Sequence, residues 1–417
     1  MFLSRTAILI GAYAFNVLAS SNTREPSQDV LRDDVTHGHL DLTHDLFGFH
    51  KNLTQIESIS GNEEAVGNWL FESLSSQGYN VEKQIVAKDP LRFNVLAWPG
   101  SKRDAKVLVS SHIDTVPPFY DYKHHNDKTI SGRGSVDAKA SVAAQIIAAN
   151  SLLQDNEINP DDVSFLYVVG EEVGGDGMRA ANDLNLKPST IIFGEPTEGK
   201  LASGHKGMLS FKLHAKGKAA HSGYPWLGLS ANEVIVTALA ALMELGQNLP
   251  VDEKFGVTTI NLGKIQGGVA HNVVAESAEA LVAIRIAQGT PAFMRNETTT
   301  AINTAISKFL KKDQQPADIL DIEFSGEGYS PVDIDADVPG FDTFIVNYGT
   351  DIPNLKKSVD GQKRYLYGPG TILVAHSDHE AITEDQLQDA VGGYKKLILH
   401  AAGKTSTVDT GTFKDSL

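Results

Sequence analysis

Four short apolar runs in this sequence lead into histidine or carboxylate residues, and this arrangement restricts the fold more than any other feature. The runs and the residues after them are 107–109 before His112 and Asp114, 165–169 before Glu171 and Glu172, 191–193 before Glu195, and 372–375 before His376. Runs this apolar are typical of buried strands in a mostly parallel sheet flanked by helices. We therefore expect an α/β domain with its site beyond the carboxyl ends of the strands.

Two helices are predicted around these strands. The pattern Ser60-Gly61-Asn62-Glu63 resembles a capping box and predicts a helix that ends at Gly78. A second helix is predicted from Ala138 to Leu153, directly after Asp137 and the glycine-rich turn 132–136. Asp137 is thereby placed where it can join the residues at the strand ends.

The pattern changes between residues 208 and 330. Strand-like and helix-like segments follow one another there in the order βαββαβ, the layout of a small ferredoxin-like α+β domain. We expect this segment to be an inserted lid or dimerisation domain. The catalytic domain would then comprise residues 46–207 and 331–417, the second part ending in a C-terminal tail.

Composition excludes several classes of partner. The 417 residues carry a formal net charge of −16, which disfavours nucleic acid and anionic membranes. The chain has no cysteine, so any bound metal must be held by nitrogen and oxygen atoms.

The first residues have the pattern of a secretory signal peptide. Arg5 precedes an apolar run at 6–19, which is too short for a membrane span and contains Asn16. We expect a signal peptide at 1–19, an N-terminal tail at 20–45 and a secreted protein. Glycosylation sequons at Asn52 and Asn296 agree with an extracellular location.

The predicted strand ends gather a donor set for divalent metal ions. Two histidines with several carboxylates suit zinc, and cobalt and manganese remain open. A shared carboxylate can hold two such ions about 3.5 to 4 Å apart, and the ions lower the pKa of a bound water toward about 7. A carboxylate that binds no metal is then needed as the general base. The adjacent Glu171 and Glu172 offer one residue for each task.

Four motifs in chain order resemble one known family. They are Ser110-Ser111-His112-Ile113-Asp114-Thr115-Val116-Pro117, Gly132-Arg133-Gly134-Ser135-Val136-Asp137-Ala138-Lys139, Gly170-Glu171-Glu172-Val173-Gly174 and Gly194-Glu195-Pro196-Thr197. Together they are similar to the co-catalytic zinc metallopeptidases and deacylases, which include acetylornithine deacetylase, succinyl-diaminopimelate desuccinylase, aminoacylase and glutamate carboxypeptidase. The resemblance runs from about Ser58 to the segment after His376.

The resemblance implies two Zn²⁺ per subunit and a role for each site residue. Asp137 would bridge the ions, His112 and Glu195 would complete one, and Glu172 and His376 the other. Glu171 would be the general base, and the Asp114 carboxylate would accept the imidazole N–H of His112. The family's spacing between the last ligand and a following glutamate favours His376 over the nearby His379.

The resemblance also implies substrate contacts. His221, in Gly217-Lys218-Ala219-Ala220-His221-Ser222, would stabilise the oxyanion, often in the partner subunit's site. Asn272 and Arg285 of the lid and the loop bearing Gly368 and Gly370 would bind the substrate carboxylate. The alternatives are a turn role for Asn272 and a surface role for Arg285.

A glutamate at position 195 resembles carboxypeptidases and deacylases more than aminopeptidases. We therefore expect a metallo-carboxypeptidase acting on a peptide or N-acyl-amino-acid amide bond next to a free carboxylate. An N-acyl-amino-acid deacylase is the alternative, followed by an aminopeptidase or a non-catalytic binding relative. The oligomeric state stays open between a homodimer through the lid domain, which is common for the family, and a monomer.

Overall fold

The computed structural model describes residues 44–404. The predicted signal peptide, nearly all of the predicted N-terminal tail and the last residues of the C-terminal tail lie outside the described residues. The α-helices of the described part are α1 (Leu46–Gln55), α2 (Glu64–Ser76), α3 (Lys139–Gln154), α4 (Asp176–Ala181), α5 (Ala231–Asn248), α6 (Pro291–Ile306) and α7 (Glu384–Ala402). None of these helices is both long and apolar enough to cross a membrane.

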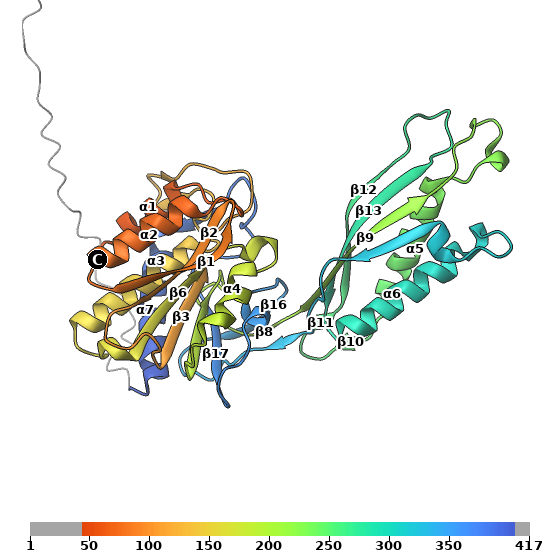
Figure 1. Cartoon of the computed structure of the whole chain (residues 1–417). Helices are drawn as coiled ribbons and strands as arrows, with labels where there is room; N and C mark the ends of the chain where they lie inside the picture. The colour runs from red at the N-terminus through yellow and green to blue at the C-terminus, as the bar shows by residue number, and fades with distance from the viewer. Residues whose placement is uncertain (1–43, 405–417) are drawn as a thin grey trace, which may run out of the picture. The chain divides into compact units, whose positions relative to one another are not determined.

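A six-stranded sheet forms the centre of the α/β part (Figure 1). Its strands in spatial order are β1 (Asn80–Lys88), β2 (Leu91–Trp98), β6 (Val163–Val168), β3 (Val107–His112), β7 (Thr190–Gly194) and β17 (Lys363–Tyr367). The last four are mutually parallel, whereas β1 and β2 pair antiparallel. The predicted mixed, mostly parallel α/β fold is therefore confirmed.

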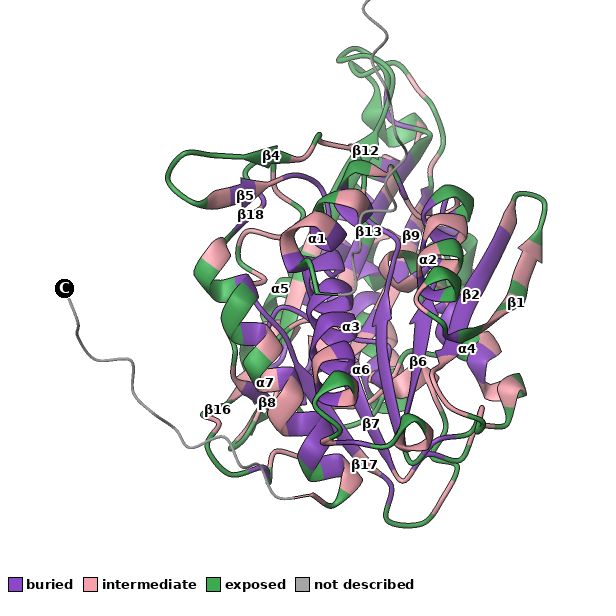
Figure 2. Cartoon of the chain, turned by 90° about the vertical axis from the view of Figure 1, so that its left-hand side faces the viewer, coloured by how far each residue is buried: buried purple, intermediate pink, exposed green. Residues whose placement is uncertain are grey.

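Alternate side chains of the central strands enter two different cores. Val107 and Val109 of β3 pack with α1, α2, α3 and α7 on one face of the sheet. Leu108 packs on the other face, in the cluster that contains Met178 of α4 and Ala202 of β8. Burial on both faces explains why these strands are nearly continuously apolar. Figure 2 shows α3 and the central strands as the most buried elements.

Two small sheets complete the α/β part. β8 (Leu201–His205) lies between β15 (Val332–Asp333) and β16 (Thr343–Val346). β5 (Thr129–Ser131) lies between β4 (Lys123–His124) and β18 (Ala381–Thr383). The second sheet joins the segment before Asp137 to the segment after His376.

The predicted βαββαβ segment forms a separate antiparallel sheet covered by α5 and α6. Its strands in spatial order are β12 (Thr259–Gly267), β13 (Ser277–Ile286), β9 (Gly207–Lys216) and β14 (Leu320–Phe324). A short hairpin of β10 (Val251–Asp252) and β11 (Gly256–Val257) is added between α5 and β12. Inward residues of the sheet and the two helices form a hydrophobic core of their own.

The predicted helix before Gly78 is present as α2, but its predicted capping box and the predicted strand at 372–375 are wrong. The helix α2 begins at Glu64, and its N-cap residue Glu63 makes no capping side-chain hydrogen bond; Glu63 instead pairs with Arg92 at 2.7 Å. The run 372–375 is a series of turns with Leu373 81% exposed. The last sheet strand is β17, which ends before Gly368-Pro369-Gly370.

Candidate metal centre

The parallel strands bring the predicted residues to one edge of the central sheet. The element that carries each is as follows: His112 ends β3, Glu171 and Glu172 form a 3-10 helix after β6, Glu195 follows β7, Asp137 precedes α3, and His376 lies in the turns after β17. Because β3, β6 and β7 are parallel neighbours, their carboxyl ends meet at this edge.

Asp137 lies between the two histidines. His112 Nε2 is 3.0 Å from Asp137 Oδ1, and His376 Nε2 is 3.3 Å from Asp137 Oδ2. Each carboxylate oxygen therefore faces a different imidazole. This is the arrangement expected of a carboxylate that bridges two cations.

The two remaining candidate ligands lie on opposite sides of Asp137. Glu195 Oε2 is 3.8 Å from His112 Nε2, and Glu172 Oε2 is 3.0 Å from His376 Nε2. Donor atoms of His112, Asp137 and Glu172 lie within 4.8 Å of one another, as do those of His112, Glu171 and Glu195. The structure thus brings together the pairing that the resemblance implied.

The charges of this cluster fit a pair of divalent cations. The cluster has two imidazoles and four carboxylates, which belong to Asp137, Glu171, Glu172 and Glu195. Within residues 44–404, the ion pairs of these carboxylates are with histidines. Burial, with the neighbouring carboxylates, raises the pKa of Glu195 to about 8. Hydrogen bonds to Asp137 and Glu172 raise the pKa of His376 to about 10. The cluster therefore retains protons at neutral pH, and metal ions would replace that positive charge.

The buried Asp114 connects His112 to the loop of Glu171. The Nδ1 atom of His112 lies 3.0 Å from the main-chain carbonyl of Asp114 and 3.5 Å from its carboxylate, so the predicted carboxylate contact is the longer one. The carboxylate instead accepts hydrogen bonds from Ser60 Oγ at 2.7 Å and from the backbone N–H groups of Glu171 and Glu172. Donation from Nδ1 leaves Nε2 of His112 free for a metal.

The surroundings of Glu171 suit a proton acceptor. Burial, followed by the nearby charge of Glu195, raises the pKa of Glu171 well above its ordinary value. Asp351, which sequence reasoning missed, also acts on Glu171, and its carboxylate packs against Gly175 and accepts from Asn354 Nδ2 at 3.1 Å. No motif marked Asp351 because it is 180 residues from Glu171 in the chain.

The loop with Gly368 and Gly370 packs directly against the segment that follows Glu195. A Cβ on Gly368 would lie 2.3 Å from the carbonyl oxygen of Glu195, so a larger residue does not fit there. The Gly368 carbonyl accepts hydrogen bonds from the backbone N–H groups of Thr197 and Gly199. The loop therefore lies beside a candidate ligand, as the carboxylate-binding prediction requires.

The structure separates the predicted lid residues into two groups. His221 and Asn272 are exposed and adjacent, since Ser222 N donates to Asn272 O at 3.0 Å. They flank the end of the lid sheet where Ser277 pairs with Lys216, whereas Arg285 pairs with Met208 at the other end. Eight residues of β13 separate these ends, about 26 Å at the usual strand rise. Asn272 and Arg285 of one chain therefore do not bind the same carboxylate.

Three other predicted features can be placed. His379 is exposed and contacts Asp378, at 3.0 Å, and not the candidate ligands. Asn52 lies in α1 and the exposed Asn296 in α6, and the threonine two residues after each is buried. Helical sequons differ from the loop sites usual for glycosylation, so use of these two stays a prediction.

Two segments of the chain match known protein families. Residues 203–318 match the peptidase dimerisation domain of M20 enzymes, and residues 94–190 match peptidase family M28. A probable carboxypeptidase of Aspergillus niger is 50% identical over 84% of this chain and 88% of its own length. One of Aspergillus flavus is 48% identical over 84% of this chain and 86% of its own length. The chain belongs to the M20 family of metallopeptidases.

Solved peptidase structures, two of which are described as M20 members, share the fold. The match to a tripeptidase of Staphylococcus aureus spans 86% of this chain and 98% of that protein, with a TM-score of 0.70 and 22% sequence identity. A metallo-carboxypeptidase of Sulfolobus solfataricus covers 86% and 99%, with a TM-score of 0.67 and 16% identity. A dinuclear metal-binding M20 peptidase of Bacillus subtilis covers 87% and 99%, with a TM-score of 0.60 and 16% identity. This likeness shows the fold, and together with the relatives named probable carboxypeptidases it identifies the chain as a peptidase enzyme.

Proposed function

We propose that this M20 peptidase is a secreted, two-zinc carboxypeptidase that cleaves the amide bond next to a free C-terminal carboxylate. The observation that carries the proposal is the position of Asp137 between His112 and His376, with Glu171 beside them. The relatives named probable carboxypeptidases support the substrate class.

Each residue of the centre has a task in amide hydrolysis. His112 and Glu195 would hold one zinc, Glu172 and His376 the other, and Asp137 both. When bound, the ions would polarise the carbonyl group and lower the pKa of water. Glu171 would take a proton from the attacking water and deliver it to the leaving amine. Asp114 would hold His112 and the Glu171 loop in fixed positions relative to each other.

Arg285 is the candidate anchor for the substrate carboxylate. Its Nη1 atom would lie 3.4 Å from a Cβ placed on Gly349, so this glycine permits a close approach of the 349–351 segment to the guanidinium group. Burial raises the pKa of the nearby Tyr329 to about 12, and both Arg285 and Glu171 influence that hydroxyl. A guanidinium group that acts on the same hydroxyl as the general base suits binding of a carboxylate near the scissile bond.

Matched N-blocked dipeptides, one with a free and one with an amidated C-terminus, test the substrate class. We expect kcat/KM to be about 10- to 100-fold higher for the free acid, because a charge-assisted hydrogen bond contributes about 1.5 to 3 kcal/mol. Arg285→Gln should remove most of this difference by slowing the acid alone. Equal rates for acid and amide would contradict a carboxypeptidase, and preference for an unblocked peptide or a simple N-acyl-amino acid would favour the aminopeptidase or deacylase alternative.

The separation of His221 from Arg285 supports a homodimer through the lid. The exposed apolar side chains of this region include Tyr224, Trp226, Leu227, Val236, Met243 and Val269. β12 is an edge strand whose outer half is exposed, and such edges pair readily with another chain. A second copy seated on this surface would carry its His221 toward a site other than its own.

Mixing two inactive variants tests whether His221 acts in the partner subunit. His221→Ala alone should lower kcat by about 10²- to 10³-fold, as does loss of an oxyanion donor. After equal amounts of His221→Ala and Glu171→Ala protein exchange subunits, about a quarter of wild-type activity should return. Half of the dimers would then be mixed, and one of the two sites in each mixed dimer would be intact. No recovery after verified subunit exchange would contradict a role in the partner's site.

Secretion is proposed from the N-terminal pattern. The apolar run at 6–19 is preceded by Arg5 and followed by small residues. The mature chain is expected to begin at residue 20 or nearby. A protein that retains residues 1–19 would contradict this part of the proposal.

A further inference from the structure

The loop that presents Asp137 is held by a glutamate from a distant part of the chain. Glu380 Oε1 accepts hydrogen bonds from the backbone N–H groups of Val136 at 3.0 Å and Asp137 at 3.2 Å. Its other carboxylate oxygen, Oε2, is 2.6 Å from Arg133 Nη1, and both side chains are only 2% exposed. The carboxylate of Glu380 therefore fixes the main chain at the candidate bridging residue.

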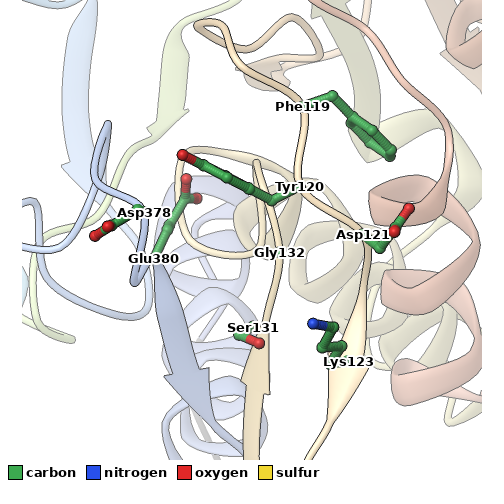
Figure 3. Close-up of a pocket in the computed structure, with 8 residues that line it drawn as sticks. All are labelled: Phe119, Tyr120, Asp121, Lys123, Ser131, Gly132, Asp378 and Glu380. Atoms are coloured by element: carbon green, nitrogen blue, oxygen red, sulfur yellow. The ribbon is translucent and has the colours of Figure 1, made fainter.

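Arg133 is itself anchored on three sides. In addition to its pair with Glu380, its Nε donates to the carbonyl oxygen of Pro118 at 3.1 Å. Its guanidinium carbon lies 5.1 Å from the ring centroid of Tyr120. Tyr120 and Glu380 line a cavity of about 240 Å³, in which Figure 3 shows their side chains near each other. Glu380 of the pair thus lies in the wall of this cavity, and Arg133 lies behind it.

The same segment also carries the candidate ligand on the opposite side of Asp137. His376 precedes Glu380 by four residues, is half-exposed, and has a φ of 63°, a left-handed conformation uncommon outside glycine. Its turn is joined to the Asp137 loop because β18 pairs with β5 and Gly132 N donates to Glu380 O at 3.3 Å. One segment therefore supplies an imidazole for Asp137 and the carboxylate that holds its backbone.

We propose that the Arg133–Glu380 pair is a positioning device that sets the distance between Asp137 and His376, and thereby the affinity for the metal ion that they share. The inference rests on the proposed two-metal function. Neither Arg133 nor Glu380 belongs to the groups of candidate metal ligands in the described part of the chain, so both would act through the ligands. Outer partners of metal ligands commonly change metal affinity by about 10- to 100-fold.

Glu380→Gln is the decisive variant because it keeps the size of the side chain and an oxygen for the backbone N–H groups. It removes the charge that pairs with Arg133. We expect zinc affinity at the site that Asp137 and His376 share to fall about 10- to 100-fold, measured by competition with a chromogenic chelator on folded protein. The absorption spectrum of the cobalt-loaded protein should also change. Arg133→Lys retains the positive charge and should give an intermediate loss.

Glu63→Gln is the matched control. Glu63 forms a similar buried pair with Arg92 and has no hydrogen bond to the 132–137 or 376–380 segments in the described structure. Its loss should lower the melting temperature without changing zinc affinity or the cobalt spectrum.

Unchanged zinc affinity and an unchanged cobalt spectrum in folded Glu380→Gln would overturn the positioning role. If that variant does not fold, the same outcome in Arg133→Lys would overturn it. A wild-type protein that binds no pair of ions would contradict the proposed metal function itself, and the positioning role with it. Full metal binding without peptidase activity would affect only the proposed function.

Discussion

Replacing Glu171 by glutamine is expected to lower kcat by about 10²- to 10⁴-fold, the usual contribution of a general base, while the protein keeps its metal ions. The glutamine has nearly the same shape but does not take up a proton. The backbone N–H of residue 171 still donates to Asp114, so the loop should stay in place. Steady-state kinetics and metal analysis of the same preparation measure both results.

Glu82→Gln is a suitable control for Glu171→Gln. Glu82 pairs with Arg103 on the surface, and its side chain is 41% exposed. Its replacement should leave kcat and metal content unchanged. Near-wild-type turnover of Glu171→Gln would assign the general base to another residue.

Replacing Asp137 by asparagine is expected to remove metal as well as activity. The two carboxylate oxygens of Asp137 face different histidines, so loss of its charge weakens both halves of the proposed centre. The fall in metal affinity should exceed the about 10- to 100-fold typical of outer partners, and turnover should fall to background with it. Metal content after gel filtration and turnover at saturating zinc measure the two effects.

His379→Ala is the control for the Asp137 variant. His379 lies three residues after His376, but its ring pairs with Asp378, which is not a candidate ligand. It should therefore keep both ions, whereas His376→Ala should lose one. Two bound ions in Asp137→Asn would contradict the bridging role.

The strand-end residues could be predicted from the sequence because their signal is local. An apolar strand buried on both faces is recognisable in the residues themselves, and parallel pairing brings its carboxyl end to the same edge as its neighbours. His112, Glu171, Glu172 and Glu195 follow this rule. The pairing of individual ligands depended on the resemblance, and the distances around Asp137 agree with it.

The errors arose where tertiary contacts outweigh local pattern. β17 contains Lys363 and Arg364, so it does not read as a buried strand, although Arg364 is 7% exposed and bonded to Gln362. Run 372–375 is apolar but forms turns before His376. The sequence pattern predicts Ser60 as part of a helix cap, whereas its hydroxyl donates to Asp114, 54 residues later in the chain.

For the lid, the sequence predicts the order of the elements but not the relative positions of the residues that they carry. The order βαββαβ follows from periodicity and is confirmed. The positions of His221 and Asn272 relative to Arg285 depend on the pairing of β9 with β13, which places them at opposite ends of one sheet. Local sequence pattern does not predict this pairing of the strands, and so it does not predict the distance between these residues.

The most direct test of the central claim is a zinc titration of chelator-treated protein with the N-blocked free-acid dipeptide as substrate. Activity should be absent after chelation and return with added zinc until two ions per chain are bound. The protein should also release protons during the titration, because ions replace the protons held by the His376 and Glu195 cluster. Full hydrolysis by protein shown to contain no metal would contradict the account.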